Sequence, residues 1–252
     1  MNKFFVSSDI HSAYTPWMNG LIEAGFDINN PDHKIIICGD LFDRLDETVK
    51  CFEFVKGLGD RAIYIKGNHE SLLFDCMNEI RCGRVPGSHH YHNGTIKTIC
   101  QFCGENEWII YDPTWRDKIC DIMQPILDWI DEKCVNYAEI GDYVFVHGWI
   151  PCYEGLDDFR NATEEDWENA RWENGMQMWR FPKCRVDGKT VVCGHWHCSW
   201  GWSRLRQKRK EFPQKTKKDW LESFEPFIDD GIAAIDSCVV YTDKINVLTL
   251  EA

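Results

Sequence analysis

The chain has 252 residues, of which 44% are hydrophobic and 27% charged, a composition that excludes disordered and fibrous proteins. Its formal net charge of -13 argues against non-specific nucleic-acid binding, which needs a basic surface, so we expect no nucleic-acid partner. A chain of this length can bury a core without disulfide staples, and we predict one domain over residues 1–252.

The cysteines and the N-terminal segment bear on the cellular compartment. Six of the 13 cysteines lie inside apolar runs, where a free thiol behaves as a small hydrophobic residue, as expected in a reducing compartment. The first residues show no signal-peptide pattern, and no apolar stretch approaches membrane-spanning length. We therefore expect a cytoplasmic protein that does not bind a membrane.

Five short runs rich in β-branched and aromatic residues predict buried strands. They are Lys3–Ser7, Lys34–Cys38, Ala62–Lys66, Tyr143–Val146 and Thr190–Cys193. Segments with apolar residues at helical spacing lie between them and predict helices. These are Pro16–Ala24, Asp46–Leu58, Ser71–Arg81 and Trp115–Tyr137, the last containing Pro125. The alternation of strands and helices predicts an α/β fold.

Three more apolar runs lie near the C-terminus, at residues 231–236, 238–241 and 245–250. With Asp243 and Lys244 as a turn, they predict short strands of a second sheet. The whole pattern therefore predicts a central β-sandwich flanked by α-helices.

Each of the first five predicted strands is followed at once by residue types that bind metals. These residues are Asp9 and His11, Asp40 and Asp43, Asn68 and His69, His147, and then His195 and His197. The carboxyl ends of strands in an open α/β sheet meet at one crevice. Any one of these residues fits a turn or a helix cap, but turn chemistry alone does not explain all five strand ends. The sequence therefore predicts one shared metal site.

These residues form motifs that resemble, in order, those of calcineurin-like metallophosphoesterases. The motifs are Ser8-Asp9-Ile10-His11, Gly39-Asp40-Leu41-Phe42-Asp43-Arg44, Gly67-Asn68-His69-Glu70, His147-Gly148 and Gly194-His195-Trp196-His197. The second and third are most similar to the serine/threonine phosphoprotein phosphatase branch, including its small bacterial and phage members. Residues 235–238 also resemble the end of such domains. The resemblance implies a metallophosphoesterase-type β-sandwich with its metal site at the carboxyl ends of the strands.

The resemblance implies two divalent metal ions that share the Asp40 carboxylate. Asp9, His11, Asp40 and His197 would hold one ion, and Asp40, Asn68, His147 and His195 the other. Mixed oxygen and imidazole ligands suit Mn²⁺, our first expectation, as well as Fe or Zn²⁺. A water bridging the two ions would be acidified to hydroxide and attack phosphorus in line.

Residues outside the metal shell would complete the reaction. His69 would protonate the leaving oxygen while Asp43 accepts a hydrogen bond from its other ring nitrogen. Arg44 would bind the phosphoryl oxygens through its forked guanidinium. Asn68 and Arg171 are further candidates for substrate binding, although Arg171 also fits an exposed arginine on a helix.

Three positions depart from the phosphoprotein phosphatase pattern. Ser12 and Leu45 stand where that branch usually has glycine, and Trp149 replaces a second glycine after His147. We therefore expect the backbone near the phosphate to differ from that branch, which affects the substrate assignment more than the metal ligands.

Other features receive structural interpretations. The Trp-rich segment predicts a helical insertion at about residues 149–185 whose tryptophans pack in the core, with a base-stacking platform as the alternative. His89, His90 and His92 suggest a polar loop, and Cys100 and Cys103 suggest thiols in a helix.

A basic segment, Arg204 to Lys218, stands out in this acidic chain and predicts a solvated loop at about residues 203–219. The alternative is that it attracts a polyanionic substrate to a nearby site.

The sequence therefore predicts a metal-dependent phosphomonoesterase acting on phosphoserine or phosphothreonine, with a phosphorylated protein or nucleotide as its partner. The enzymatic alternative is a nucleotide hydrolase, either a dinucleoside polyphosphatase or a cyclic nucleotide phosphodiesterase. Asp43 and Glu70 favour the first hypothesis, because bacterial dinucleoside tetraphosphatases, which are also similar, typically lack that Asp and have Asp in place of the Glu. A non-enzymatic binding scaffold on the same fold is the third hypothesis.

Overall fold

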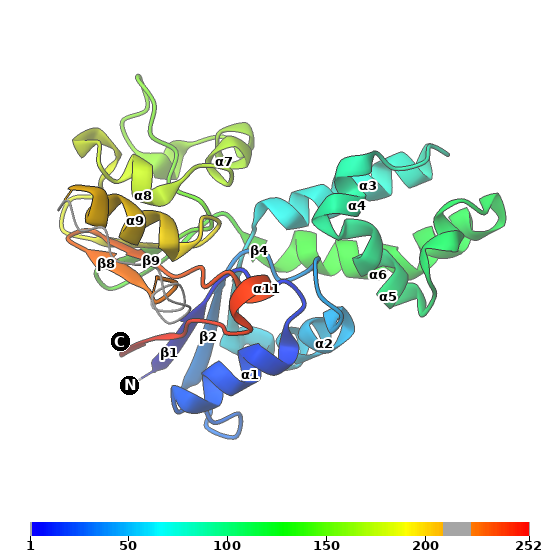
Figure 1. The fold of residues 1–252 in the computed structure, drawn as a ribbon, viewed down its shortest axis with the longest axis horizontal. Helices are drawn as coiled ribbons and strands as arrows, with labels where there is room; N and C mark the ends of the chain where they lie inside the picture. The colour runs from blue at the N-terminus through cyan, green and yellow to red at the C-terminus, as the bar shows by residue number, and fades with distance from the viewer. Residues whose placement is uncertain (1, 209–222, 252) are drawn as a thin grey trace.

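Two five-stranded sheets stack face to face in the computed structural model, which describes residues 2–208 and 223–251 (Figure 1). The first sheet has the order β10 (Leu248–Glu251), β1 (Lys3–Ser7), β2 (His33–Cys38), β3 (Ala62–Ile65) and β4 (Cys134–Val135). The second has the order β5 (Ala138–Ile140), β6 (Tyr143–Phe145), β7 (Thr190–Cys193), β9 (Ile232–Ala234) and β8 (Phe227–Asp229). Strands β1 to β4 are parallel, as are β6, β7 and β9, so each sheet brings several carboxyl ends to one edge.

The five predicted strands are confirmed as β1, β2, β3, β6 and β7, each within one residue of its predicted bounds. Alternation along the strands sends side chains to two different cores. Phe4 and Ile36 pack between the two sheets, whereas Phe5 and Ile35 point to the opposite face of the first sheet. Both faces of this sheet are therefore buried, as expected for parallel strands.

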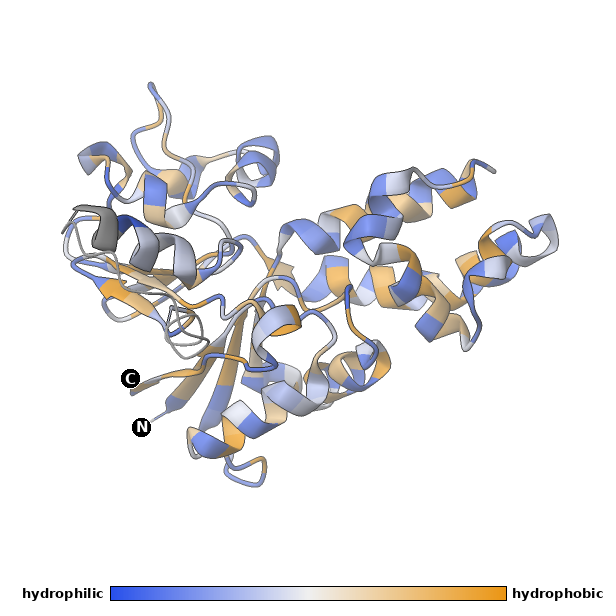
Figure 2. Ribbon diagram, in the orientation of Figure 1, coloured by the Kyte–Doolittle hydropathy of each residue, from blue (hydrophilic) through white to orange (hydrophobic). Residues whose placement is uncertain are grey.

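Helices cover the outer face of the first sheet. They are α1 (Tyr14–Glu23), α2 (Thr48–Leu58), α3 (Asn68–Arg81), α4 (Ser88–Asn93), α5 (Thr95–Cys103) and α6 (Arg116–Lys133), with short 3₁₀ helices at Gly59–Arg61, Glu107–Ile110 and Pro113–Trp115. Helix α6 continues through Pro125. In Figure 2 these helices show hydrophilic and hydrophobic stretches in alternation, the pattern of helices with one face in the core.

The outer face of the second sheet is covered by α7 (Glu164–Ala170), α8 (Gly175–Met178), α9 (Cys198–Lys208) and 3₁₀ helices at Phe159–Asn161 and Pro182–Cys184. Trp149 and Trp167 are buried there, which confirms core packing for these two tryptophans. A disulfide joins Cys152 to Cys184, although no sequence pattern indicated a pair of cysteines.

Predictions of local structure are wrong for several short segments. Residues 238–241, predicted as a strand, fall in helix α11 (Val239–Thr242), where Val239 packs into the core beneath the first sheet and the Asp236 carboxylate accepts the backbone N–H of Cys238. The histidine cluster predicted as a loop forms α4, which packs His90 inward. Periodicity does not distinguish strand from helix in such short runs.

The last strand also differs from its expected partner, because β10 pairs antiparallel with β1 and so extends the first sheet. The start of the basic segment, residues 204–208, was predicted as part of a loop but forms the end of α9. Residues 209–218 lie outside the described residues, so the predicted loop is not tested there. No helix within residues 2–208 or 223–251 is long and apolar enough to cross a membrane.

Candidate metal centre

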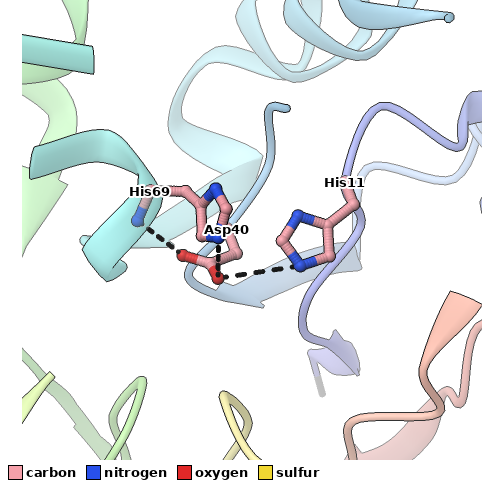
Figure 3. A group of neighbouring side chains, drawn as sticks. All are labelled: His11, Asp40 and His69. Carbon is pink, nitrogen blue, oxygen red and sulfur yellow. Dashed lines mark hydrogen bonds and ion pairs between the residues drawn. The ribbon is translucent and has the colours of Figure 1, made fainter. Parts of the chain in front are cut away.

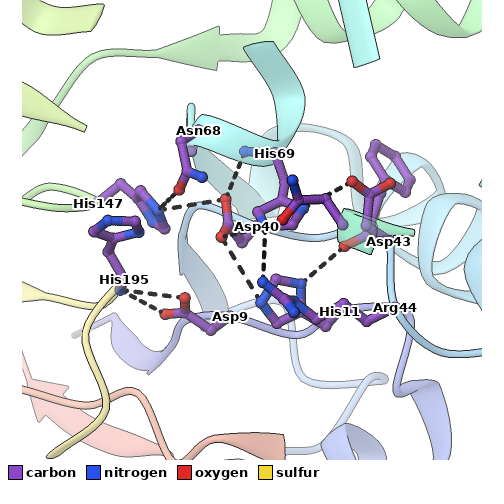
Figure 4. A network of polar contacts seen from close by, with 12 residues as sticks. Asp9, His11, Asp40, Asp43, Arg44, Asn68, His69, His147 and His195 are labelled. Carbon is purple, nitrogen blue, oxygen red and sulfur yellow. Dashed lines mark hydrogen bonds and ion pairs between the residues drawn. The ribbon is translucent and has the colours of Figure 1, made fainter. Parts of the chain in front are cut away.

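The residues that follow the five strands converge on one place at the edge of the sandwich (Figure 4). Asp9 and His11 follow β1, Asp40 follows β2, Asn68 begins α3 after β3, and His147 and His195 follow β6 and β7 of the other sheet. Ligand types from both sheets thus face one another across the end of the interface.

Backbone strain is concentrated at the same place. Among the described non-glycine residues nine have positive φ, and seven of them lie in the motifs or, for Ser12, directly after one: Asp9, His11, Ser12, Asp40, Asp43, Arg44 and His195. Each such conformation costs on the order of 1 kcal/mol or more and persists where surrounding contacts enforce it. The strain is therefore the cost of pointing these side chains at a common centre.

Asp40 lies at the middle of the cluster (Figure 3). Its carboxylate forms two groups of potential ligand atoms, one with His11 and His69 and one with His147 and His195, and within each group the atoms lie within 4.8 Å of one another. Oδ2 is 3.8 Å from His11 Nε2, and Oδ1 is 3.4 Å from His147 Nε2. The two oxygens thus face different histidines, an arrangement that fits a carboxylate shared by two ions.

Hydrogen bonds to the backbone fix which nitrogen of each imidazole faces the centre. His147 Nδ1 lies 2.8 Å from the Cys38 carbonyl oxygen, and His11 Nδ1 lies 3.1 Å from that of Phe42. A carbonyl only accepts, so Nδ1 carries the proton in both rings and each Nε2 presents a lone pair. His147 Nε2 lies 2.7 Å from Asn68 Oδ1, which brings two acceptors together. Such a donor set fits a metal ion.

Burial shifts the pKa values of the carboxylates and of three imidazoles in the cluster, in each case towards the neutral form. Burial raises the pKa of Asp40 and of Asp9 well above the usual range, and for Asp9 the nearby Asp236 raises it further. Burial also lowers the pKa of His11 and His147 well below normal and that of His195 to about 4. His11, His147 and His195 are therefore neutral imidazoles, and a metal ion between them would offset the cost of ionising the buried carboxylates.

Asp9 and His197 lie on the side of the centre formed by β1 and β7. The Asp9 carboxylate accepts the backbone N–H of His195, at 3.0 Å to Oδ2. The His197 side chain is 52% exposed, with Nε2 3.9 Å from Oδ2 of the buried Asp236. His197 is therefore the most open of the predicted ligands, and it lies outside the two tight groups around Asp40.

His69 and Asp43 form a buried pair beside Asp40. His69 Nδ1 donates to Asp43 Oδ2 at 2.7 Å, while the other Asp43 oxygen accepts the Thr98 hydroxyl at 2.7 Å. Thr95 also donates to Asp43 Oδ2, and the Asp43 N–H donates back to Thr98. Three donors thus surround an acceptor-only carboxylate.

The environment of His69 favours its protonated form. Burial opposes the charge, but Asp40 and the hydrogen-bonded Asp43 outweigh burial and raise the pKa of His69 to about 9. The exposed Arg44 places Nη2 3.3 Å from His69 Nε2, and its charge counteracts part of that rise. The His69 imidazole and the Arg44 guanidinium therefore lie side by side next to Asp40.

Glu70 holds the loops that carry these groups. Its buried carboxylate accepts the backbone N–H groups of Gly67 at 2.8 Å and of Asp40 and Leu41 at 3.0 Å. A Cβ on Gly67 would overlap the Asp40 carboxylate, so glycine is required for close approach here. The third motif is thus tied to the second through a carboxylate.

Arg171 is buried rather than exposed. It is 2% exposed, and its guanidinium pairs with Glu168 at 2.5 Å, with Glu164 at 2.7 Å and with Asn136. The structure therefore places Arg171 in a polar network with its charge already paired.

Four residues with roles around the site were not selected from the sequence: Glu70, Thr95, Thr98 and Asp236. Glu70 lies in the third motif and Asp236 in residues 235–238, so the resemblance to the family could have identified both as site residues. The threonines act on Asp43 from more than fifty positions away and leave no local signal.

Comparisons with known proteins agree with this geometry. The family model of calcineurin-like phosphoesterases matches residues 3–229. Two curated relatives are named as symmetrical bis(5'-nucleosyl)-tetraphosphatases: one from Glaesserella parasuis, 30% identical over 78 residues, and one from Actinobacillus succinogenes, 32% identical over 81 residues. The matches cover 31% and 32% of this chain and 28% of each relative.

Solved structures share the fold at low identity. A protein assigned as a diadenosine tetraphosphatase aligns over 99% of this chain and 89% of its own, with a TM-score of 0.53 and 14% identity. A cold-active protein tyrosine phosphatase aligns over 100% and 74%, with a TM-score of 0.56 and 14% identity. A serine/threonine phosphatase from Saccharomyces cerevisiae aligns over 100% and 80%, with a TM-score of 0.52 and 16% identity.

The chain belongs to the calcineurin-like phosphoesterase family. It is a phosphoesterase with a buried cluster of histidines and aspartates at the position of the metal site, and its fold is the predicted two-sheet sandwich flanked by helices. The intact cluster argues against the scaffold hypothesis.

Proposed function

We propose that the cluster binds two divalent metal ions and that the chain hydrolyses phosphate esters or anhydrides there. The ligands would be Asp9, His11, Asp40 and His197 for one ion and Asp40, Asn68, His147 and His195 for the other. The single observation that carries this proposal is the buried Asp40 carboxylate, which lies between His11 on one side and His147 and His195 on the other. Because the ligands come from both sheets, we also propose that residues 1–252 act as one domain.

Manganese is the metal we would supply first, since carboxylate, amide and imidazole ligands together suit Mn²⁺, with Fe or Zn²⁺ as alternatives. When bound, a pair of such ions supplies Lewis acidity, which offsets phosphoryl charge and makes water more acidic.

The remaining steps belong to side chains outside the metal ligands. We assign His69 as the group that gives a proton to the leaving oxygen from Nε2, while Asp43 holds Nδ1 and stabilises the imidazolium. Arg44 is exposed beside it and would bind the phosphoryl oxygens together with Asn68. Arg171 reaches a phosphate only if its contacts with Glu164 and Glu168 open, so we assign it the smallest part.

Dinucleoside polyphosphates are the substrate class that we place first. The two curated relatives carry that activity in their names, which favours the nucleotide alternative over the phosphoserine hypothesis. These relatives match less than a third of the chain.

Phosphoserine or phosphothreonine is the second candidate, and the His69–Asp43 pair favours it. A phosphate leaving group has a pKa of about 6 and departs without a proton, whereas a serine alkoxide needs one. His69 is a buried proton donor, and its partner Asp43 is held by hydrogen bonds from His69, Thr95 and Thr98, an arrangement that suits the poorer leaving group.

A substrate panel with Mn²⁺-loaded protein tests these proposals. The panel contains diadenosine tetraphosphate, phosphoserine and phosphothreonine peptides, and cyclic AMP, with products separated by chromatography. We expect kcat/KM for diadenosine tetraphosphate to exceed that for the peptides at least tenfold. The reverse order would make the chain a phosphoprotein phosphatase, and activity that persists in Asp40→Asn would contradict the assigned centre.

A further inference from the structure

Two large aromatic side chains are half exposed directly beside His195. Trp172 follows α7 and is 48% exposed, and Trp196 follows His195 in the chain and is 42% exposed. The Trp172 ring centroid lies 5.8 Å from that of His195 at an interplanar angle of 88°, and that of Trp196 lies 6.4 Å away at 81°. Both indoles therefore flank one imidazole of the candidate metal centre, which Figure 4 places next to Asp9.

Trp172 and Trp196 differ in exposure from other tryptophans of the same region. Trp149 and Trp167, from the same tryptophan-rich region, are 1% and 3% exposed and pack in the core of the second sheet. A tryptophan carries 150 to 250 Å² of surface, roughly, which folding normally buries. Core packing therefore explains one pair of tryptophans and leaves Trp172 and Trp196 unexplained.

Backbone contacts hold the two tryptophans in place. The backbone of Trp172 accepts a hydrogen bond from the His195 ring, and its N–H donates to the Asn169 carbonyl at 3.1 Å. The Trp196 N–H donates to the Gly194 carbonyl at 2.8 Å. Their positions relative to the centre are therefore set by the segments that carry the ligands.

We propose that Trp172 and Trp196 form a stacking subsite for a nucleobase of the substrate, a proposal that rests on the proposed nucleotide function. A base has a π-face whatever its sequence identity, so exposed indoles bind it through stacking. The phosphate of a nucleotide whose base stacks there would reach the cluster around His195, and the exposed Arg44 lies beside His69 in the same centre. The subsite distinguishes a nucleotide from a phosphoserine, which has no ring to stack.

Calorimetry on the Mn²⁺-loaded protein tests the subsite without turnover. The two ligands are α,β-methylene ADP, which resists hydrolysis between its phosphorus atoms, and methylenediphosphonate, which has the same two phosphorus groups and no nucleoside. Stacking of one base corresponds to roughly tenfold to 100-fold in affinity, so the nucleotide should bind more tightly by that factor.

Substitutions separate stacking from structural damage. Trp172→Ala and Trp196→Ala should each remove most of the nucleotide's advantage while the Kd of methylenediphosphonate stays within about twofold, and phenylalanine at either position should retain part of it. Trp108→Ala is the matched control, because Trp108 is 44% exposed and its ring packs on Trp115, next to α6. It should change neither Kd.

Two results would overturn the subsite: equal affinity of the wild-type protein for both ligands, or an equal loss for both ligands in the tryptophan variants. The substrate panel reports separately on the proposed function. If only phosphopeptides are hydrolysed but the nucleotide still gains affinity through the tryptophans, the subsite stands and the proposed substrate fails.

Discussion

Replacing Asp43 with asparagine tests the chemistry of the site most directly. Asp43 Oδ2 accepts a 2.7 Å hydrogen bond from His69 Nδ1, and the carboxylate charge contributes to the raised pKa of His69. The asparagine side chain would keep the size of the aspartate and remove its charge. The Thr98 hydroxyl can rotate to accept from the new amide, so we expect the fold to tolerate the change.

The expected magnitude depends on the leaving group. General acid catalysis contributes on the order of 10² to 10⁴ in rate when the leaving group needs a proton. With the imidazolium no longer stabilised, Asp43→Asn should lower kcat for a phosphothreonine peptide by about 100-fold or more. For p-nitrophenyl phosphate, whose phenolate leaves readily, the loss should stay below about tenfold. A nucleotide anhydride should behave like the second case, because its phosphate leaving group has a pKa of about 6.

The assay is a series of aryl and alkyl phosphates with increasingly basic leaving groups. A plot of log kcat against leaving-group pKa should be steeper for Asp43→Asn than for the wild-type protein. Melting temperature and bound metal, measured on the same preparations, control for damage to the fold or the centre. Equal losses across the whole series, with both controls unchanged, would refute the assignment of His69 as the proton donor.

Three further substitutions follow from other contacts. Asp40→Asn should reduce the metal content found by elemental analysis and abolish hydrolysis, whereas a wild-type metal content would contradict the bridging role. Thr98→Val removes the hydroxyl that contacts Asp43 at 2.7 Å and should lower kcat about tenfold on alkyl phosphates but not on p-nitrophenyl phosphate, and the same leaving-group series checks this. Glu139, whose pKa is lowered to about 2 chiefly by the Arg160 hydrogen bond, contributes stability that is complete above pH 4.5 and lost as pH falls towards 2. Glu139→Gln should therefore cost about 1 kcal/mol at pH 7 in urea unfolding, and the difference should shrink below pH 4.5.

The sequence was sufficient to locate the strands that hold the site. Buried parallel strands are continuous apolar runs, so Lys3–Ser7 and Thr190–Cys193 were found with their observed bounds. Parallel strands of one sheet end at one edge, which is why polar residues after such runs were expected to share a site. His147 follows a strand of the second sheet, and the stacking of the two sheets brings it to 3.4 Å from Asp40. Periodicity and topology carry this part of the prediction.

Single contacts between residues far apart in the chain could not be predicted from the sequence. Thr95 and Thr98 contact Asp43 because α5 packs over the second motif. A threonine in a helix forms no sequence pattern from which such a contact could be predicted. Residues 238–241 look like a strand, yet Asp236 accepts the Cys238 N–H and Val239 packs inward, so tertiary contacts favour a helix. Local preference is weak wherever a few buried contacts decide the structure.

The same packing of α5 over the second motif leads to a last prediction, at the junction of α4 and α5. Gly94 has φ of +90°, and a Cβ there would overlap the Arg44 backbone nitrogen and lie 2.8 Å from its Cα. Gly94→Ala must therefore displace the segment that carries Asp43 and Arg44, in addition to the cost of about 1 kcal/mol for alanine at positive φ.

Gly104 is the matched control for Gly94, because it has φ of +68° and a Cβ there meets nothing within 4 Å. Both alanine variants should lose about 1 kcal/mol of stability from backbone strain, and urea unfolding should show a larger total loss for Gly94→Ala, because only there is a packed segment displaced. Only Gly94→Ala should also lose activity on alkyl phosphates, because only there does the new methyl group move the His69–Asp43 pair. Equal activity in the two variants would mean that the loop at Asp43 adapts without moving the pair, so that α5 supports the fold but does not position the proton donor.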